Sequence, residues 1–80
     1  MNLYLLEATA GYEEYDGFVI AAPTAKIARE LAQNVVGPVV AKSNYSANQN
    51  FVDPKRVTCV KIGTTNRKRP YIVLASNTGA

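Results

Sequence analysis

The densest group of carboxylates in the sequence lies in one short segment, Tyr12-Glu13-Glu14-Tyr15-Asp16. Neighbouring carboxylates can hold a hard cation or can act as a general acid and a general base. The segment lacks the ligand spacing of a calcium-binding loop, and adjacent side chains in a loop between strands usually diverge. A solvated loop is the favoured interpretation, ahead of a protein-binding surface, with metal binding or catalysis last. We therefore treat the segment as a candidate partner-binding acidic loop and predict no metal site.

A second charged group is basic and comprises Arg67, Lys68 and Arg69, with Lys55 and Arg56 nearby in the sequence. Cationic loops bind phosphates through charge and counterion release, and a neighbouring aromatic such as Tyr71 could stack on a base. The first and favoured alternative is a loop whose charges keep the strand connection soluble and prevent pairing at the sheet edge. A contact with the acidic surface of a partner protein is the second alternative, and nucleic acid is the third, since no nucleic-acid-binding motif is present.

Nucleophilic chemistry has little support, because the chain of 80 residues contains no His and a single Cys. Triads that activate Ser or Cys through His are excluded, and one Cys forms neither an intramolecular disulfide nor a zinc site. Cys59 lies between Thr58 and Val60, as expected for a buried small hydrophobe in a strand. No phosphate-binding glycine motif occurs. We predict a protein that is not an enzyme, binds no cofactor, and resides in a reducing, cytoplasmic compartment.

Hydrophobic patterning predicts five elements along one domain, residues 1–80. Apolar runs predict strands over residues 2–9, 17–22, 57–63 and 71–75, and a helix follows Thr24. The expected fold class is α+β, a small antiparallel sheet (β-β-α-β-β) with one helix packed on one face. The suggested strand order is 2-1-3-4, and the other sheet face would be half exposed and available to a partner. Residues 38–56 yield no assignment apart from a turn at Asp53-Pro54.

The helix has the clearest signals. Thr24 is a suitable N-cap, and Gly37-Pro38 is a typical stop. Ile27, Leu31 and Val35 recur at the helical period and, with the flanking Ala28 and Ala32, predict one apolar stripe. Four polar residues are expected on the solvent side: Lys26, Arg29, Glu30 and Gln33. The N-terminal apolar run is too short for a signal peptide or a membrane span, which predicts no membrane association.

Charge is distributed unevenly along the chain. The formal net charge is +3. Residues 1–40 carry five carboxylates against two cations, a balance of −3, and residues 41–80 carry seven cations against one carboxylate, a balance of +6. The sequence therefore predicts a bipolar molecule, with an acidic loop near one end and a basic loop elsewhere.

The sequence resembles a group of small proteins encoded by bacteriophages and prophages. The likeness rests on three opening motifs and two closing ones: Leu3-Tyr4-Leu5-Leu6, the acidic loop, Phe18-Val19-Ile20-Ala21-Ala22, the segment from Val57 to Thr64, and Val73-Leu74-Ala75-Ser76-Asn77. It departs between Val39 and Val52, and Arg67 to Arg69 are more basic than in the group. Short phage accessory proteins commonly bind and inhibit a host protein or a defence complex, CRISPR effectors included.

The resemblance thus implies a phage-encoded binding protein that acts by surface occlusion on a host protein or ribonucleoprotein complex, in the host cytoplasm. It transfers no catalytic residue. Two alternatives stay open: a small nucleic-acid-binding module that uses the basic residues, and a structural or assembly component of a virion.

Overall fold

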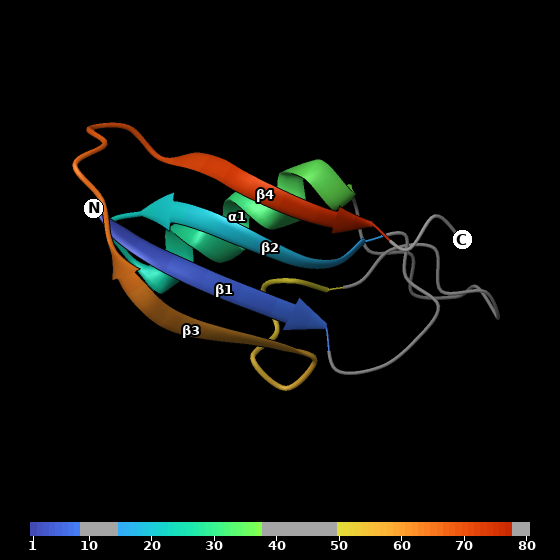
Figure 1. Cartoon of the computed structure of the whole chain (residues 1–80). Coiled ribbons are helices and arrows are strands. Elements are labelled where there is room, and N and C mark those ends of the chain that lie inside the picture. The colour runs from blue at the N-terminus through green and yellow to red at the C-terminus, as the bar shows by residue number, and fades with distance from the viewer. Residues whose placement is uncertain (9–14, 38–49, 78–80) are drawn as a thin grey trace, which may run out of the picture.

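The computed structural model describes residues 1–8, 15–37 and 50–77 of the chain. It contains one helix and four strands (Figure 1): β1 Asn2–Ala8, β2 Tyr15–Ala22, α1 Ala25–Val36, β3 Val57–Thr64 and β4 Tyr71–Asn77. The strands form a single antiparallel sheet, and the helix packs on one of its faces. The expected α+β fold and its element order are confirmed.

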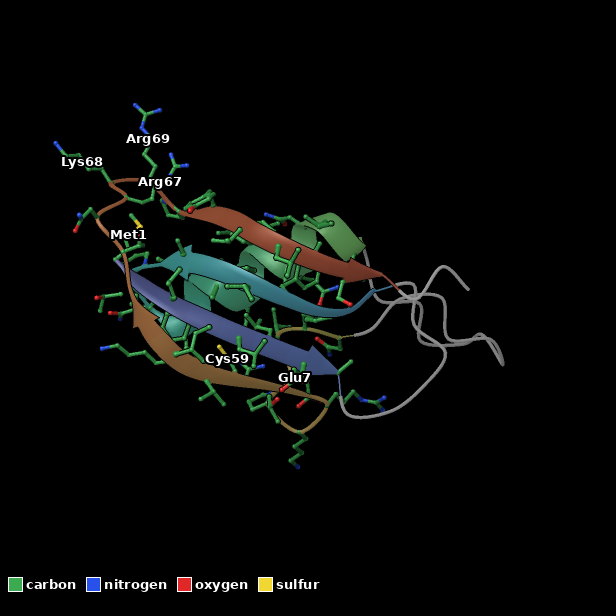
Figure 2. All side chains as sticks on the ribbon, in the orientation of Figure 1. Met1, Glu7, Cys59, Arg67, Lys68 and Arg69 are labelled. Atoms are coloured by element: carbon green, nitrogen blue, oxygen red, sulfur yellow. The ribbon has the colours of Figure 1, made fainter. Side chains whose placement is uncertain are left out.

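The order of the strands differs from the expectation. The sheet runs β3-β1-β2-β4, so the order 2-1-3-4 is wrong and β4 lies beside β2, at the edge opposite β3. In this place Ile72 pairs with Ile20 and packs against the core. The connection 65–70 therefore crosses the ends of β1 and β2, a span of about 14 Å at normal strand spacing. Its cations lie at the same end of the sheet as Met1 (Figure 2).

The helix begins and ends where the sequence predicts. The Thr24 hydroxyl accepts a hydrogen bond from the Ile27 amide at 3.2 Å, and Gly37 ends the helix with a φ of 94°. The buried stripe, however, consists of Ala28, Ala32 and Val36, while Val35 is 42% exposed. Alanine allows the helix backbone to approach the sheet closely. The face with the smallest side chains therefore turns inward. The expected stripe is confirmed for Ala28 and Ala32, with Ile27 and Leu31 partly buried beside them, and is wrong for Val35.

The core between helix and sheet includes one residue that the sequence patterns did not indicate. Phe51 is fully buried, and its ring meets that of Phe18 edge to face, with centroids 5.1 Å apart. The expected turn at Asp53 is confirmed. The Asp53 carbonyl accepts from the amides of Arg56 and Val57, and its carboxylate accepts from the Lys55 amide at 2.9 Å.

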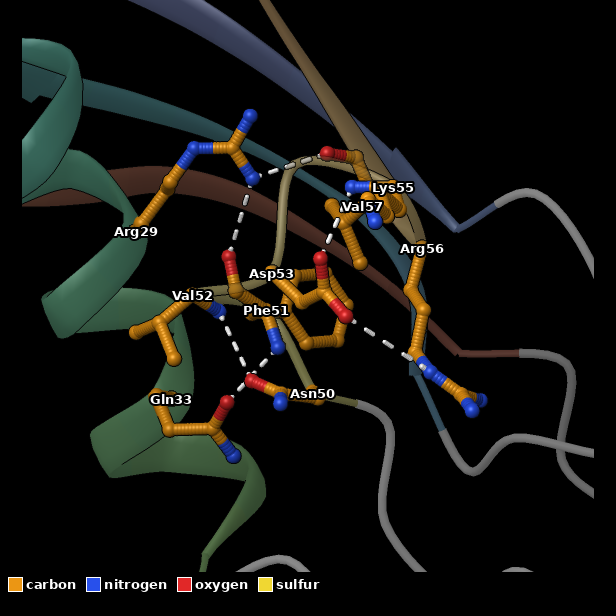
Figure 3. Close-up of polar contacts among 9 residues, drawn as sticks. All are labelled: Arg29, Gln33, Asn50, Phe51, Val52, Asp53, Lys55, Arg56 and Val57. Atoms are coloured by element: carbon orange, nitrogen blue, oxygen red, sulfur yellow. Dashed lines mark hydrogen bonds and ion pairs between the residues drawn. The ribbon is translucent and has the colours of Figure 1, made fainter.

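Two helix side chains hold this segment against the helix (Figure 3). Arg29 donates to the Phe51 carbonyl at 3.1 Å and to the Val57 carbonyl at 2.8 Å. The Gln33 side chain accepts from the Phe51 amide at 2.6 Å and donates to the Gly37 carbonyl at 2.7 Å. The prediction that both residues face solvent is wrong. An irregular segment cannot satisfy all its backbone groups in a ladder, so long polar side chains supply the partners.

Candidate functional site

The connection between β3 and β4 is fixed to the start of β1. The Thr65 amide donates to the Met1 carbonyl at 2.8 Å, and the Met1 nitrogen donates to the Thr65 carbonyl at 2.9 Å. The Arg67 amide donates to the Thr65 hydroxyl at 3.3 Å. These bonds extend the order of the sheet into the connection, so its cations project from a supported backbone.

The cations of this connection, Arg67, Lys68 and Arg69, are named the basic end. All three are exposed. The Arg67 guanidinium carbon lies 4.3 Å from the centre of the Tyr71 ring, a cation–π geometry. No ion pair is observed between the basic end and any residue that the structure describes. The basic end is thus a local concentration of positive charge that the described carboxylates leave unneutralised.

Lys55 and Arg56 are not part of the basic end. They precede β3, whereas the basic end follows it, and eight strand residues separate the two groups by about 26 Å. Arg56 also lies 3.8 Å from the Asp53 carboxylate, which offsets its charge. The five basic residues that were grouped by sequence therefore belong to opposite ends of the sheet.

The acidic loop falls largely outside the described residues. Tyr12, Glu13 and Glu14 are not described, and Tyr15 and Asp16 are described only as backbone at the start of β2. The flanking residues Ala8 and Tyr15 lie at the sheet end opposite the basic end, where the exposed Glu7 also lies (Figure 2). The strand ends that flank the acidic loop and the basic end are therefore separated by the length of the sheet.

The sheet face away from the helix is the second surface of interest and is named the open face. The strand register aligns its side chains in three rows, each crossing all four strands. The middle row is Val60–Leu5–Val19–Leu74. The row nearest the basic end is Gly63–Leu3–Ala21–Tyr71, and the row at the opposite end is Thr58–Glu7–Gly17–Ser76.

The middle row is apolar throughout, and its outer members Val60 and Leu74 are 54% and 62% exposed. Beside it, the missing side chain of Gly17 leaves a hollow of about 170 Å³ bordered by Leu5, Leu74 and Glu7. The open side of an antiparallel sheet usually carries polar residues. The expectation of a half-exposed sheet face is confirmed. The continuous apolar row was missed, since it depends on the strand order.

Cys59 gives no sign of an activated thiol. It lies half-buried on the helix side of the sheet. Burial raises its pKa above the ordinary thiol value, and the positive charge of Arg29 opposes this only in part. A raised pKa keeps the sulfur protonated near neutral pH, where a thiol is a poor nucleophile.

Metal binding and membrane insertion were considered for residues 1–8, 15–37 and 50–77. There, no group of three or more Cys, Asp or Glu side chains is placed to hold a metal ion. The single described helix is too short and polar to cross a bilayer. Comparison with protein-family models, with curated proteins and with solved structures found no match. The two features that stand out are surfaces, the basic end and the open face.

Proposed function

We propose that this chain is a non-catalytic binding protein whose basic end contacts an acidic surface of a partner protein and blocks that surface. The observation that carries the proposal is the basic end itself, three exposed cations on a backbone fixed to β1. The resemblance to phage-encoded accessory proteins favours a host protein or a defence complex, such as a CRISPR effector, as the partner. Inhibition would follow from occlusion.

The order of the basic end supports binding more than simple solvation. Cations on a pre-ordered backbone lose less conformational freedom on binding, so more of the interaction energy remains as affinity. Complementary charge also speeds association and discriminates against partners of the wrong sign. Neither Lys68 nor Arg69 has a described carboxylate to give up before it meets a partner.

A nucleic-acid partner is less well supported by the same geometry. One face of the Tyr71 ring is covered by the Arg67 guanidinium, which competes with a stacked base. Lys55 and Arg56 lie at the far end of β3, so they do not extend the basic end into a track for a phosphate backbone. Three phosphate contacts would give a single strand a salt slope of only about −2.

The proposal is tested by capture from host-cell lysate. The protein is immobilised through a tag placed after β4, which finishes at the sheet end away from the basic end. We expect wild type to retain one acidic protein in amounts comparable to the bait. The variant Lys68→Glu/Arg69→Glu should lose it, and the control Lys55→Glu, at the other end of β3, should keep it.

Two results would overturn the proposal. One is equal retention by the double variant and the control, or no retained protein in the lysate of the host. The other is tight, salt-dependent binding of a labelled single-stranded oligonucleotide that the double variant abolishes, which would replace the protein partner by nucleic acid.

A further inference from the structure

The open face is hollowed beside Gly17, where one row of the sheet lacks a side chain. In that row the register places Glu7 on one side of Gly17 and Ser76 on the other. The adjoining middle row supplies apolar walls from Leu5 and Leu74. Together these residues border a hollow of about 170 Å³, which is named the Gly17 hollow.

The Gly17 hollow is built into the backbone of the sheet. A Cβ at position 17 would lie 3.0 Å from the Leu6 carbonyl oxygen, so the close approach of β1 and β2 disfavours any side chain there. On its other side Glu7 pairs with Thr58, whose hydroxyl donates to the Glu7 carbonyl at 3.3 Å. Binding sites in proteins are usually largely pre-formed, and this one needs no rearrangement of the strands.

The volume of the Gly17 hollow limits what can occupy it. Pockets that bind small molecules usually measure about 300–1,000 Å³, well above the volume of this hollow. An apolar cavity of about 150 Å³ holds benzene, which has about six heavy atoms. The hollow therefore suits the end of one side chain from a partner protein, whose backbone stays outside the face, better than a whole small molecule.

We infer that the Gly17 hollow binds an arginine side chain of a partner protein. Glu7 is the one charged group among the described residues that line the hollow, and it makes no ion pair with a cation in the described part of the chain. A guanidinium meets a carboxylate through two parallel hydrogen bonds, while its aliphatic stem lies against apolar walls such as Leu5 and Leu74. Beyond its Cβ, an arginine side chain has about six heavy atoms, which matches the size of the hollow.

Arginine satisfies the Gly17 hollow better than the other side chains of similar length. An apolar side chain would remove water from the Glu7 carboxylate without pairing it, which is unfavourable. Lysine supplies a point charge, but it lacks the planar fork that matches a carboxylate. Arginine is also enriched among the residues that dominate the binding energy of protein interfaces.

An NMR titration of the isotope-labelled protein with Nα-acetyl-arginine N-methylamide tests the inference. The corresponding citrulline compound is a neutral probe of the same shape. We expect the arginine probe to shift the amide signals of Leu5, Gly17 and Leu74 and to saturate with a dissociation constant on the order of 1–10 mM. The citrulline probe should bind about three- to fivefold more weakly, because it forms no ion pair with Glu7.

Three variants locate the site. Glu7→Gln should weaken the arginine probe about three- to fivefold and leave the citrulline probe unchanged. Glu30→Gln removes the same charge from an exposed position on the helix, so it is the matched control and should bind like wild type. Ser76→Phe places a ring beside Gly17 and should prevent binding of both probes, while amide signals away from the hollow stay as in wild type.

Four results would overturn the inference. The first is the absence of localised, saturating shifts up to about 50 mM of the arginine probe, well above the expected dissociation constant. The second is equal affinity of Glu7→Gln and Glu30→Gln for that probe. The third is equal binding of the arginine and citrulline probes, which would make the hollow a purely apolar site. The fourth is equal or tighter binding of the corresponding lysine compound, which would reject arginine as the occupant. None of these outcomes affects the proposed function, which rests on Lys68 and Arg69.

Discussion

Replacing Arg29 by Met removes the guanidinium but keeps most of the aliphatic side chain, so it isolates the two hydrogen bonds to the Phe51 and Val57 carbonyls. A hydrogen bond from a charged donor contributes about 1.5–3 kcal/mol, and both acceptors would lose this donor. Because the two bonds share one donor nitrogen, we expect the free energy of unfolding to fall by about 3 kcal/mol rather than by the full sum of two such bonds. For a domain of this size that lowers Tm by about 12–24 °C.

Urea denaturation followed by circular dichroism measures the change for Arg29→Met. Lys26→Met is the matched control, because Lys26 is exposed on the same helix and its loss should stay within about 0.5 kcal/mol. If Arg29→Met proves as stable as this control, then Arg29 does not hold the segment before β3, and the account of how that segment is attached is wrong.

Three further predictions concern single positions. Gly17→Ala should lower the free energy of unfolding by about 1 kcal/mol, because a Cβ there would lie 3.0 Å from the Leu6 carbonyl oxygen. Gly63→Ala should be tolerated, because the nearest atom to its Cβ would lie 3.7 Å away. Equal denaturation midpoints for the two variants would contradict this. Thr24→Ala should cost about 1 kcal/mol in the same assay through loss of the N-cap, and Thr24→Ser should not. The Cys59 thiol should react with iodoacetamide several-fold more slowly in the native than in the urea-unfolded chain near pH 8.5, since burial raises its pKa in the folded state. Because the folded state keeps this proton to higher pH, the free energy of unfolding should fall as pH rises from the ordinary thiol pKa through the raised value. Cys59→Ser should remove that part of the pH dependence.

Local signals in the sequence located the secondary structure well. The cap at Thr24 and the stop at Gly37 depend on hydrogen bonds and dihedral angles within one turn, which nearby residues determine. Alternation in β3 also separates Val57 and Cys59 from Thr58 and Val60, and in the structure the first pair faces the helix. Features of this range need no knowledge of the rest of the chain.

Long-range features were missed for a common reason. The alternation of apolar residues in β4 is the same whether β4 pairs with β2 or with β3. The strand order could therefore not be derived from that alternation. Phe51 and Val52 form an isolated apolar pair that carries no periodic signal. A charged residue such as Arg29 is expected to face solvent. All three become intelligible only when the sheet, the helix and the segment before β3 are placed together.

For the candidate sites too, the sequence located individual residues but not their arrangement in space. The sequence located the basic residues, but distance along the chain is a poor guide to distance across a sheet, so Lys55 and Arg56 were grouped with cations at the other end. The middle row of the open face combines residues from four strands.

The most direct test of the proposed function is calorimetric titration of the captured partner with wild-type protein and with Lys68→Glu/Arg69→Glu. We predict saturable binding at one partner per chain that weakens as salt rises, and a loss of about tenfold or more in the double variant. Unchanged affinity in the double variant would contradict the claim that the basic end is the binding surface.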